Sequence, residues 1–130
     1  MESVALLLTA ALFGGMVLYS AGFADVLFAV LPSNTAGASI RRAFPVFYLL
    51  VIATSLLAAI FVWNSDIWSS VWLGVIAIST LPTRQKLMPA INQTSDSGNK
   101  LRFAMLHGLS VLITLAHIVI SGWVLIRFLP

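Results

Sequence analysis

The sequence contains no cysteine and few charged residues. Without cysteine, the chain has no disulfide, thiolate metal site, iron–sulfur cluster or cysteine nucleophile. Only 8% of the 130 residues are charged, whereas 60% are hydrophobic and the mean hydropathy is +1.03. A soluble domain is about one quarter charged, so this composition leaves too few polar side chains to cover an apolar interior. It predicts an integral membrane protein that forms a single domain.

The chain also lacks the residue patterns that are typical of an enzyme. It has no convincing Ser/His/Asp spacing, no paired carboxylates and no phosphate-binding loop, and nothing visible makes Ser110 a nucleophile beside His107. We therefore expect no catalytic activity. The net charge of +3 is small and gives no reason to expect a nucleic-acid partner. The lipid bilayer is the first partner that the composition predicts.

Four apolar segments are candidate membrane spans, because a helix needs about 20 mostly apolar residues to cross the hydrocarbon core. Pro45 lies near the start of the second segment, where its missing N–H is tolerated. The third apolar run ends at Pro82, and we expect its helix to continue with a kink through TRQKLMPAINQ. The sequence thus predicts an all-α, four-helix membrane bundle over residues 1–130, with NQTSDSGNK as a polar loop. The expected spans cover about residues 4–31, 44–63, 67–90 and 103–128.

The basic residues are distributed unevenly between the expected loops. Arg41 and Arg42 lie in loop one, and four more basic residues follow the third apolar run, which ends near Pro82, and precede span four, whereas Arg127 is on the other side. Because positive residues collect on the cytoplasmic side, we expect loops one and three to face the cytoplasm and both termini to be extracytoplasmic. All four tryptophans fall on the expected outer side, as is typical of a membrane interface. We expect the bacterial inner (plasma) membrane.

The fourth segment carries a polar stripe at helical spacing. Lipid cannot satisfy polar groups, so we expect this stripe to face the interior of the bundle. Its residues are His107, Ser110, Thr114, His117 and Ser121. Small residues let helices approach closely in membranes, and the first segment has a mostly small face formed by Ala11, Gly15, Leu18, Gly22, Asp25 and Ala29. We expect this face to pack on the fourth span. The helix-packing candidates are Gly15, Gly22, Gly108 and Gly122.

Polar residues also gather at the expected cytoplasmic end. An isolated carboxylate at the depth of Asp25 would be costly, so we expect Asp25 to be protonated or paired with a nearby arginine or lysine. One interpretation of the cluster is a set of membrane-boundary anchors and helix caps, and the other is a pocket for a polar or anionic ligand. Its members are Asp25, Arg41, Arg42, Tyr48, Arg84, Asn92, His107 and Ser110.

The two histidines cannot share one metal ion or one haem. They are ten residues apart on one expected helix, which places them roughly 15 Å apart. A haem on His117 would need a histidine from a second subunit or a methionine such as Met16, Met88 or Met105. A histidine bonded across the bundle is the alternative for His117. We expect no cofactor and no metal, with haem and His117 as the alternatives.

Three segments together resemble the transmembrane protein 205-like family, also called domain of unknown function 4149. They are IRRAFPVFYLL, LPTRQKLMPAINQ and LRFAMLHGLSVL. The resemblance implies a small four-span bundle without an assigned activity, and a eukaryotic member associated with platinum-drug resistance hints at efflux or trafficking. Where the family often has an Asn after the His-Gly-Leu-Ser motif, this chain has Thr114. Carried over by position, the motif residues are Arg42, Phe44, Pro45, Tyr48, Pro82, Arg84, Asn92, Gln93, Phe103, His107, Gly108, Leu109 and Ser110.

Three functions are compatible with these observations. The first is a non-catalytic accessory or scaffold subunit of a larger membrane complex, which follows from the small size and the small-residue faces. Its partners would be other membrane subunits or further copies of the chain. The second is a transporter of a small solute or a metal drug, motivated by the polar cluster. The third is a haem-binding electron carrier, which would require His117 as a ligand.

Overall fold

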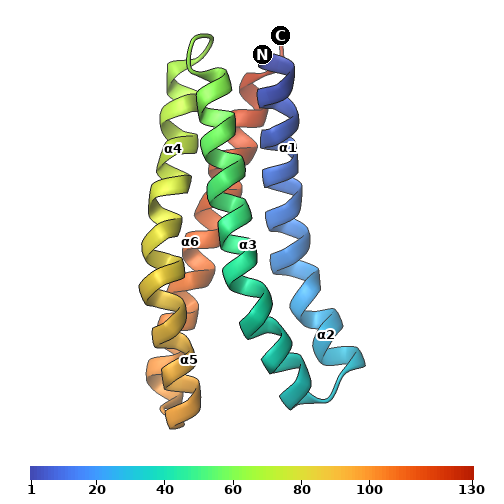
Figure 1. Ribbon diagram of the computed structural model, residues 1–130, viewed down its shortest axis with the longest axis vertical. Coiled ribbons are helices and arrows are strands. Elements are labelled where there is room, and N and C mark those ends of the chain that lie inside the picture. Colours follow the sequence, from blue (N-terminus) through green and yellow to red (C-terminus); the bar gives the residue numbers. More distant parts are fainter.

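The computed structural model describes residues 1–130 and contains helices but no strands. The helical elements form four rods. These rods lie side by side, and the two chain termini lie at the same end (Figure 1). The all-helical prediction is confirmed. Three of the four rods are long and apolar enough to cross a membrane: residues 2–30, 33–62 and 100–127. The helices are α1 (Glu2–Leu18), η1 (Tyr19–Phe23), α2 (Ala24–Val30), α3 (Ser33–Val62), α4 (Ile67–Pro82), η2 (Thr83–Leu87), α5 (Met88–Ser97) and α6 (Lys100–Arg127).

Two of the rods contain a wider, π-helical segment. The first rod changes from α1 to η1 and back to α2, and the third changes from α4 to η2 and back to α5. Pro82 ends α4 and cannot donate a backbone hydrogen bond to the turn before it. A local π-helical adjustment is one way in which a helix satisfies the backbone groups that a proline leaves free. The helix therefore continues past Pro82 as expected, and η2 follows the proline directly.

The helices extend further than their apolar segments, so two predicted loops are wrong. The second helix begins at Ser33 and not near residue 44, because only Leu31 and Pro32 separate it from the first rod. Most of the predicted loop NQTSDSGNK is helical up to Ser97, and only Gly98 and Asn99 link α5 to α6. Hydropathy locates the part of a helix that can lie in hydrocarbon. It does not locate the helix ends, where polar residues continue the same backbone hydrogen bonding.

The links at the ends of the rods have clear local causes. Gly98 has a φ of 72°, the left-handed conformation that commonly ends a helix at glycine. Asn99 follows as the N-cap of α6, and its side-chain oxygen accepts a hydrogen bond from the Arg102 backbone N–H at 3.2 Å. At the other end, Asp66 caps α4 by accepting from the backbone N–H groups of Trp68 and Ser69.

We call the end with both termini and the turn at residues 63–66 the terminal end. The opposite end, which carries every basic residue except Arg127, is the basic end. The hydrophobic core occupies the half of the molecule toward the terminal end. Large apolar side chains cover the outside of all four rods, as is typical of a lipid-facing surface. The core residues are Ala5, Leu12, Met16, Val51, Ala58, Ala59, Val62, Leu73, Ile76 and Val124.

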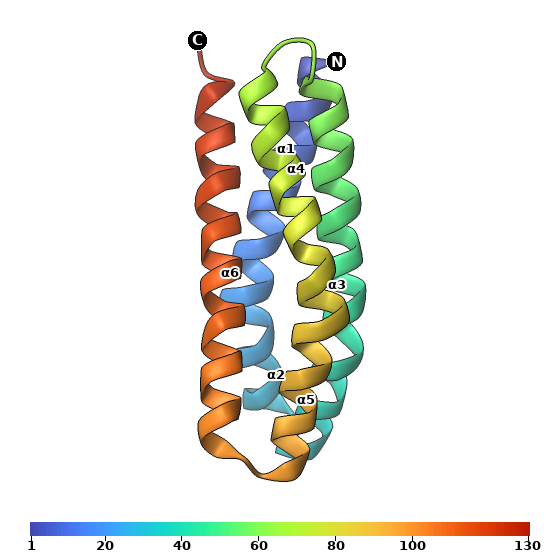
Figure 2. The same ribbon diagram turned by 90° about the vertical axis from the view of Figure 1, so that its left-hand side faces the viewer.

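Toward the basic end, α2 and α3 separate from α5 (Figure 1), and a short link joins α5 to α6 (Figure 2). There α2 packs on α3, and α5 packs on α6, without comparable packing between these two pairs. Neither η1 nor α2 contains a buried residue. The rods are therefore joined closely in the half with the core and less closely where η1 and η2 interrupt the α-helices.

Candidate functional site

An aromatic cluster joins the first rod to α3 at the level of η1. The Tyr19 ring stacks on the Phe47 ring at 4.0 Å between centroids and on the Phe23 ring at 4.7 Å. The Phe44 ring meets the Tyr19 ring edge-on at 5.2 Å. Tyr48 lies next along α3 and is buried. This cluster occupies FPVFY, one of the segments that suggested a family, and it explains why the aromatic residues occur together.

The Tyr19 hydroxyl is the one buried side-chain polar atom without a hydrogen-bond partner. A buried unpaired polar group costs free energy, and π-helical segments are frequent at functional sites. Tyr19 begins η1. The unpaired hydroxyl and the π-helix therefore single out this junction as a candidate site, although no pattern of catalytic groups surrounds it.

Arg84 reaches the same stretch of α3 from the opposite side. It lies in η2, and its Nε donates a hydrogen bond to the Pro45 carbonyl oxygen at 3.1 Å. The two π-helical segments thus flank residues 44–48 of α3, with aromatic stacking on one side and one arginine on the other. The sequence predicted that Arg84 and Tyr48 would lie at the same end, but it did not predict a bond to a backbone carbonyl.

The structure distributes the predicted polar cluster over several rods. Asp25 and Arg42 are exposed and form no ion pair. Of the two expectations for Asp25, pairing is therefore not observed, and protonation stays a prediction. Arg41 pairs with Asp96, with its Nη2 at 2.7 Å from Oδ1. Tyr48 and Ser110 are buried, whereas the other members are exposed or half-buried, and the interpretations as boundary anchors and as a ligand pocket both stay predictions.

Asp96 was missed because it lies in the stretch that was predicted to be a loop. The Arg41 guanidinium beside Asp96 holds the pKa of this carboxyl below its usual range. Both side chains are well exposed. The pair is the second link, besides Arg84 and Pro45, between α3 and the third rod at the basic end.

The polar stripe of α6 faces inward over most of its length. Ser110, His117 and Ser121 are buried, which confirms that part of the expectation. His107 is exposed, and its ring stacks on Phe103 at 5.5 Å, so the expectation that it faces the interior is wrong. The Ser110 hydroxyl donates to the His107 backbone carbonyl at 2.7 Å. His107 lies near the start of α6, where the rods diverge, and this position leaves its ring outside.

His117 is the histidine that makes a contact between helices. Its Nε2 lies 2.8 Å from the Ser79 hydroxyl of α4, within hydrogen-bonding distance. The sequence left open whether His117 ligates a cofactor or bonds across the bundle, and the structure supplies a partner for the second alternative. Ser79 was missed because serine is common in apolar helices and only the packing of α4 on α6 brings it to His117. No group of three or more potential metal ligands occurs in the chain.

The small-residue face of the first rod points outward. Ala11, Gly15 and Leu18 are exposed, while the side chains of α1 that face the other helices belong to Ala5, Thr9, Leu12 and Met16. A Cβ placed at Gly15, Gly22 or Gly108 would meet no atom within 4 Å. The expectation that this face packs on the fourth span within the chain is therefore wrong. On this rod the larger side chains of Leu12 and Met16 face inward and fill space that the small-residue face would leave empty.

Gly122 is the predicted packing glycine with a close neighbour. A Cβ at this position would lie 3.1 Å from Cε2 of Phe13. The glycine thus allows the Phe13 ring of α1 to lie directly on α6, and it confirms that the first and fourth rods are in contact. The contact uses a large residue on α1 against a small one on α6, and not two small faces.

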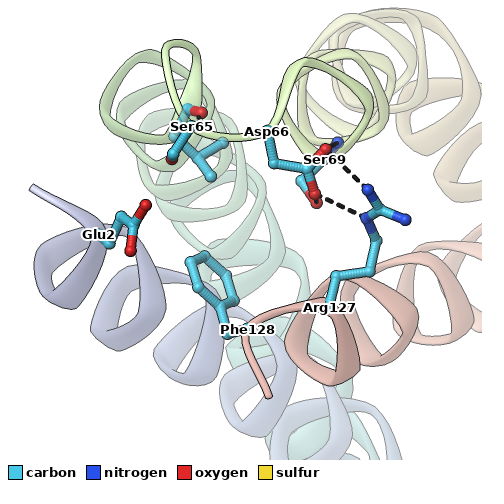
Figure 3. A pocket seen from close by; sticks show the side chains of 7 residues that line it. Glu2, Ser65, Asp66, Ser69, Arg127 and Phe128 are labelled. Carbon is cyan, nitrogen blue, oxygen red and sulfur yellow. Dashed lines mark hydrogen bonds and ion pairs between the residues drawn. The ribbon is translucent and has the colours of Figure 1, made fainter. Parts of the chain in front are cut away.

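A polar pocket of about 130 Å³ lies at the terminal end (Figure 3). Asp66 forms its centre: the carboxylate accepts hydrogen bonds from Arg127 Nε at 2.6 Å and from the Ser69 hydroxyl at 2.6 Å. Glu2 and Phe128 line the opposite side. The hydrogen bond from Arg127 contributes most to holding the pKa of the Asp66 carboxyl well below its usual range, and the hydrogen bonds from Ser69 contribute less.

The Asp66–Arg127 contact joins the turn before α4 to the last turn of α6, which the sequence analysis did not predict. The Arg127 guanidinium also lies over the Trp123 ring, 4.8 Å from its centroid. All polar groups of Asp66 are engaged by neighbours within the chain. The Asp66–Arg127 contact therefore closes the terminal end between the turn and the end of α6.

A model of the domain of unknown function DUF4149 matches residues 7–100. The chain belongs to the DUF4149 family. The match includes the aromatic cluster, Pro45 and Arg84, but it ends before the LHGLS segment with His107. The more specific likeness to transmembrane protein 205 stays a prediction. Comparisons with curated proteins and with solved structures gave no match.

Proposed function

We propose that this DUF4149 protein crosses the membrane four times and serves as a non-catalytic accessory or scaffold subunit of a larger membrane complex. Three rods already meet the length and hydropathy of a membrane span. The fourth rod has a shorter α-helical apolar part, the 16 residues of α4, but it continues through η2 and α5 to Ser97. Its outward side chains include Trp68, Val71 and Ile78, which suit a lipid environment.

The proposed orientation places the basic end in the cytoplasm. Both termini lie at the terminal end (Figure 1), as an even number of crossings requires. Arg41, Arg42 and the basic residues from Arg84 to Arg102 lie at the other end, and the distribution of arginine and lysine determines orientation in most membrane proteins. The bacterial inner membrane, which the sequence favours, stays a prediction.

The proposal of an accessory role rests on the small-residue face of α1, which points outward. Helices associate in membranes mainly through small residues that let their backbones approach. Ala11 and Gly15 are exposed, and nothing within the chain lies close to Gly15 or Gly22. The part of this surface around Ala11 and Gly15 is therefore free to receive a helix from another subunit or a second copy of the chain, while the interior is filled by side chains from the opposite face.

A substitution at Gly15 tests this role without disturbing the chain's own packing. Leucine at Gly15 meets open space in the monomer and is a better helix former than glycine. Ala10 is also exposed on α1 but lies outside the small face, so Ala10→Leu is the matched control. We expect wild type and Ala10→Leu to purify in mild detergent as an assembly larger than 14.0 kDa, and Gly15→Leu to lose it.

Native mass spectrometry on the three proteins reads the outcome directly. A wild-type protein found only as a monomer of 14.0 kDa would contradict the accessory role. If the assembly is unchanged by Gly15→Leu, the contact between subunits must lie on another face of the molecule. The argument from α1 would then be wrong.

A further inference from the structure

The basic end carries cationic side chains that no other group in the chain neutralises. Arg41 pairs with Asp96, and Arg84 bonds to the Pro45 carbonyl. The remaining four basic side chains at this end form no ion pair and are exposed: Arg42, Lys86, Lys100 and Arg102. The first turn of α6 contains two of them and no acidic residue, although a helix N-terminus already has a partial positive charge.

Three of these residues lie one hydrocarbon thickness away from a tryptophan on the same rod. At 1.5 Å per residue, Trp63 and Arg42 are about 31 Å apart along α3. By the same measure, Trp123 and Arg102 are about 31 Å apart along α6, and Trp68 and Lys86 about 27 Å apart on the third rod. The hydrocarbon core of a bilayer is about 30 Å thick. Exposed tryptophans at one interface therefore place these basic groups at the other.

We propose that Arg42, Lys86 and Arg102 form a girdle that binds the phosphate headgroups of anionic phospholipids in one leaflet. The inference rests on the proposed membrane insertion, but not on the accessory role. Long basic side chains extend along apolar surface and place their charge at the headgroup level. Their charge complements a lipid with a net negative headgroup and not a zwitterionic one.

The distribution of the three residues favours lipid over an acidic protein partner. They come from three different rods, α3, η2 and α6, and each is exposed on the outside of its own rod. An acidic protein would be bound by one continuous basic patch on one face of the molecule. Separate lipid molecules can occupy sites on different rods, which is how the girdle is arranged.

Native mass spectrometry with added lipid tests the girdle. Purified full-length protein is titrated with a mixture of phosphatidylglycerol and phosphatidylcholine of the same acyl chains. Each basic residue near a membrane surface strengthens anionic lipid binding by roughly fivefold. We therefore expect wild type to retain phosphatidylglycerol at least tenfold better than phosphatidylcholine, with a preference that falls as salt concentration rises.

Charge-removing and charge-keeping variants separate the girdle from nonspecific effects. The triple variant Arg42→Gln/Lys86→Gln/Arg102→Gln should lose the preference, whereas Arg42→Lys/Lys86→Arg/Arg102→Lys should keep it. All three side chains are exposed, so circular dichroism should show the same helix content in both variants. Equal retention of the two lipids by wild type, or an unchanged preference in the Gln variant, would overturn the proposal.

Two further outcomes would also reject lipid as the occupant. Complete displacement of phosphatidylglycerol by millimolar inorganic phosphate would assign the site to a free anion. Loss of a co-purifying acidic protein in the Gln variant, with lipid preference intact, would assign it to a protein. A protein that is monomeric but keeps its lipid preference would contradict only the accessory role, and a protein that retains neither lipid would contradict membrane insertion.

Discussion

The two ends of the molecule are held together in different ways. Toward the terminal end, apolar side chains such as Leu73, Ile76 and Val124 fill the interior and are completely buried. At the basic end, α2–α3 and α5–α6 form separate pairs that are linked by the Arg84–Pro45 bond and the Arg41–Asp96 ion pair. The first half is therefore specified by the shapes of many side chains, and the second by a few polar contacts beside two π-helical segments.

The largest effect should come from shortening a core side chain at the terminal end. Ile76 is completely buried, so Ile76→Ala should destabilise the protein by about 2–5 kcal/mol through lost contacts and a cavity. Ile78 lies two residues along the same helix and is 71% exposed, and Ile78→Ala should stay within about 0.5 kcal/mol. Unfolding in mixed detergent micelles measures both variants. Similar losses of stability in Ile76→Ala and Ile78→Ala would mean that buried core side chains do not stabilise this half of the molecule.

The next largest effect on stability should come from removing the contact between His117 and Ser79, which lies midway between the ends. Hydrogen bonds between membrane helices contribute about 0.6 kcal/mol on average and at most about 1.7 kcal/mol. A double-mutant cycle with His117→Phe and Ser79→Ala should give a coupling energy in this range. His107 is exposed and has no partner on another helix, so His107→Phe should show no coupling to Ser79→Ala. Coupling at His107 and none at His117 would reverse our assignment of the two histidines.

A smaller and local effect is expected from Arg84 at the basic end. Arg84→Gln removes the hydrogen bond to the Pro45 carbonyl and should cost about 1 kcal/mol. The loss should appear as faster hydrogen exchange in α5 and the first turns of α3, with α4 unchanged near the terminal end. Arg42→Gln is the control because Arg42 makes no contact of this kind. Faster exchange throughout the chain would show that the two halves unfold as one unit.

The smallest effect concerns Asp66 and depends on pH. Its folded-state pKa is lowered by Arg127, so the ionised carboxylate stabilises the fold above the unfolded pKa of about 3.9. This contribution is lost as the pH falls below that value toward the lower folded pKa. The difference in melting temperature between wild type and Asp66→Asn should be constant above about pH 5 and shrink below about pH 4. A difference that grows on acidification would have the wrong sign.

Hydropathy was sufficient to predict the helical class and the positions of the four rods. It could not locate the helix ends, because polar stretches such as residues 33–43 and 91–97 continue the helices beyond their apolar parts. The outward orientation of the Gly15 face was also missed, since small residues can pack inside a chain or against another one. Only the volume of the interior, filled by Leu12 and Met16, decides between the two.

The candidate site was predicted in part. The FPVFY segment was recognised from the family resemblance, and Arg84, Ser110 and His117 were recognised from their polar character and spacing. The contacts of Tyr19 with Phe47, of Ser79 with His117 and of Asp96 with Arg41 were not predicted, because each joins residues from different rods. Asp66 and Arg127 show the same limit. Nothing in the sequence indicates which acidic group an arginine 61 positions away will meet, and only the packed rods bring the two together.

The difference between the two ends can be measured directly because the chain has no cysteine. Pairs of introduced cysteines carry spin labels on the first and fourth rods: Leu7 with Ile126 at the terminal end, and Val30 with Leu101 at the basic end. All four positions are exposed. Pulsed electron paramagnetic resonance on the protein in lipid nanodiscs measures the distance between the two labels. The distance distribution should be narrow for the first pair and broad for the second. Equally narrow distributions would contradict the account of a basic end held by a few polar contacts.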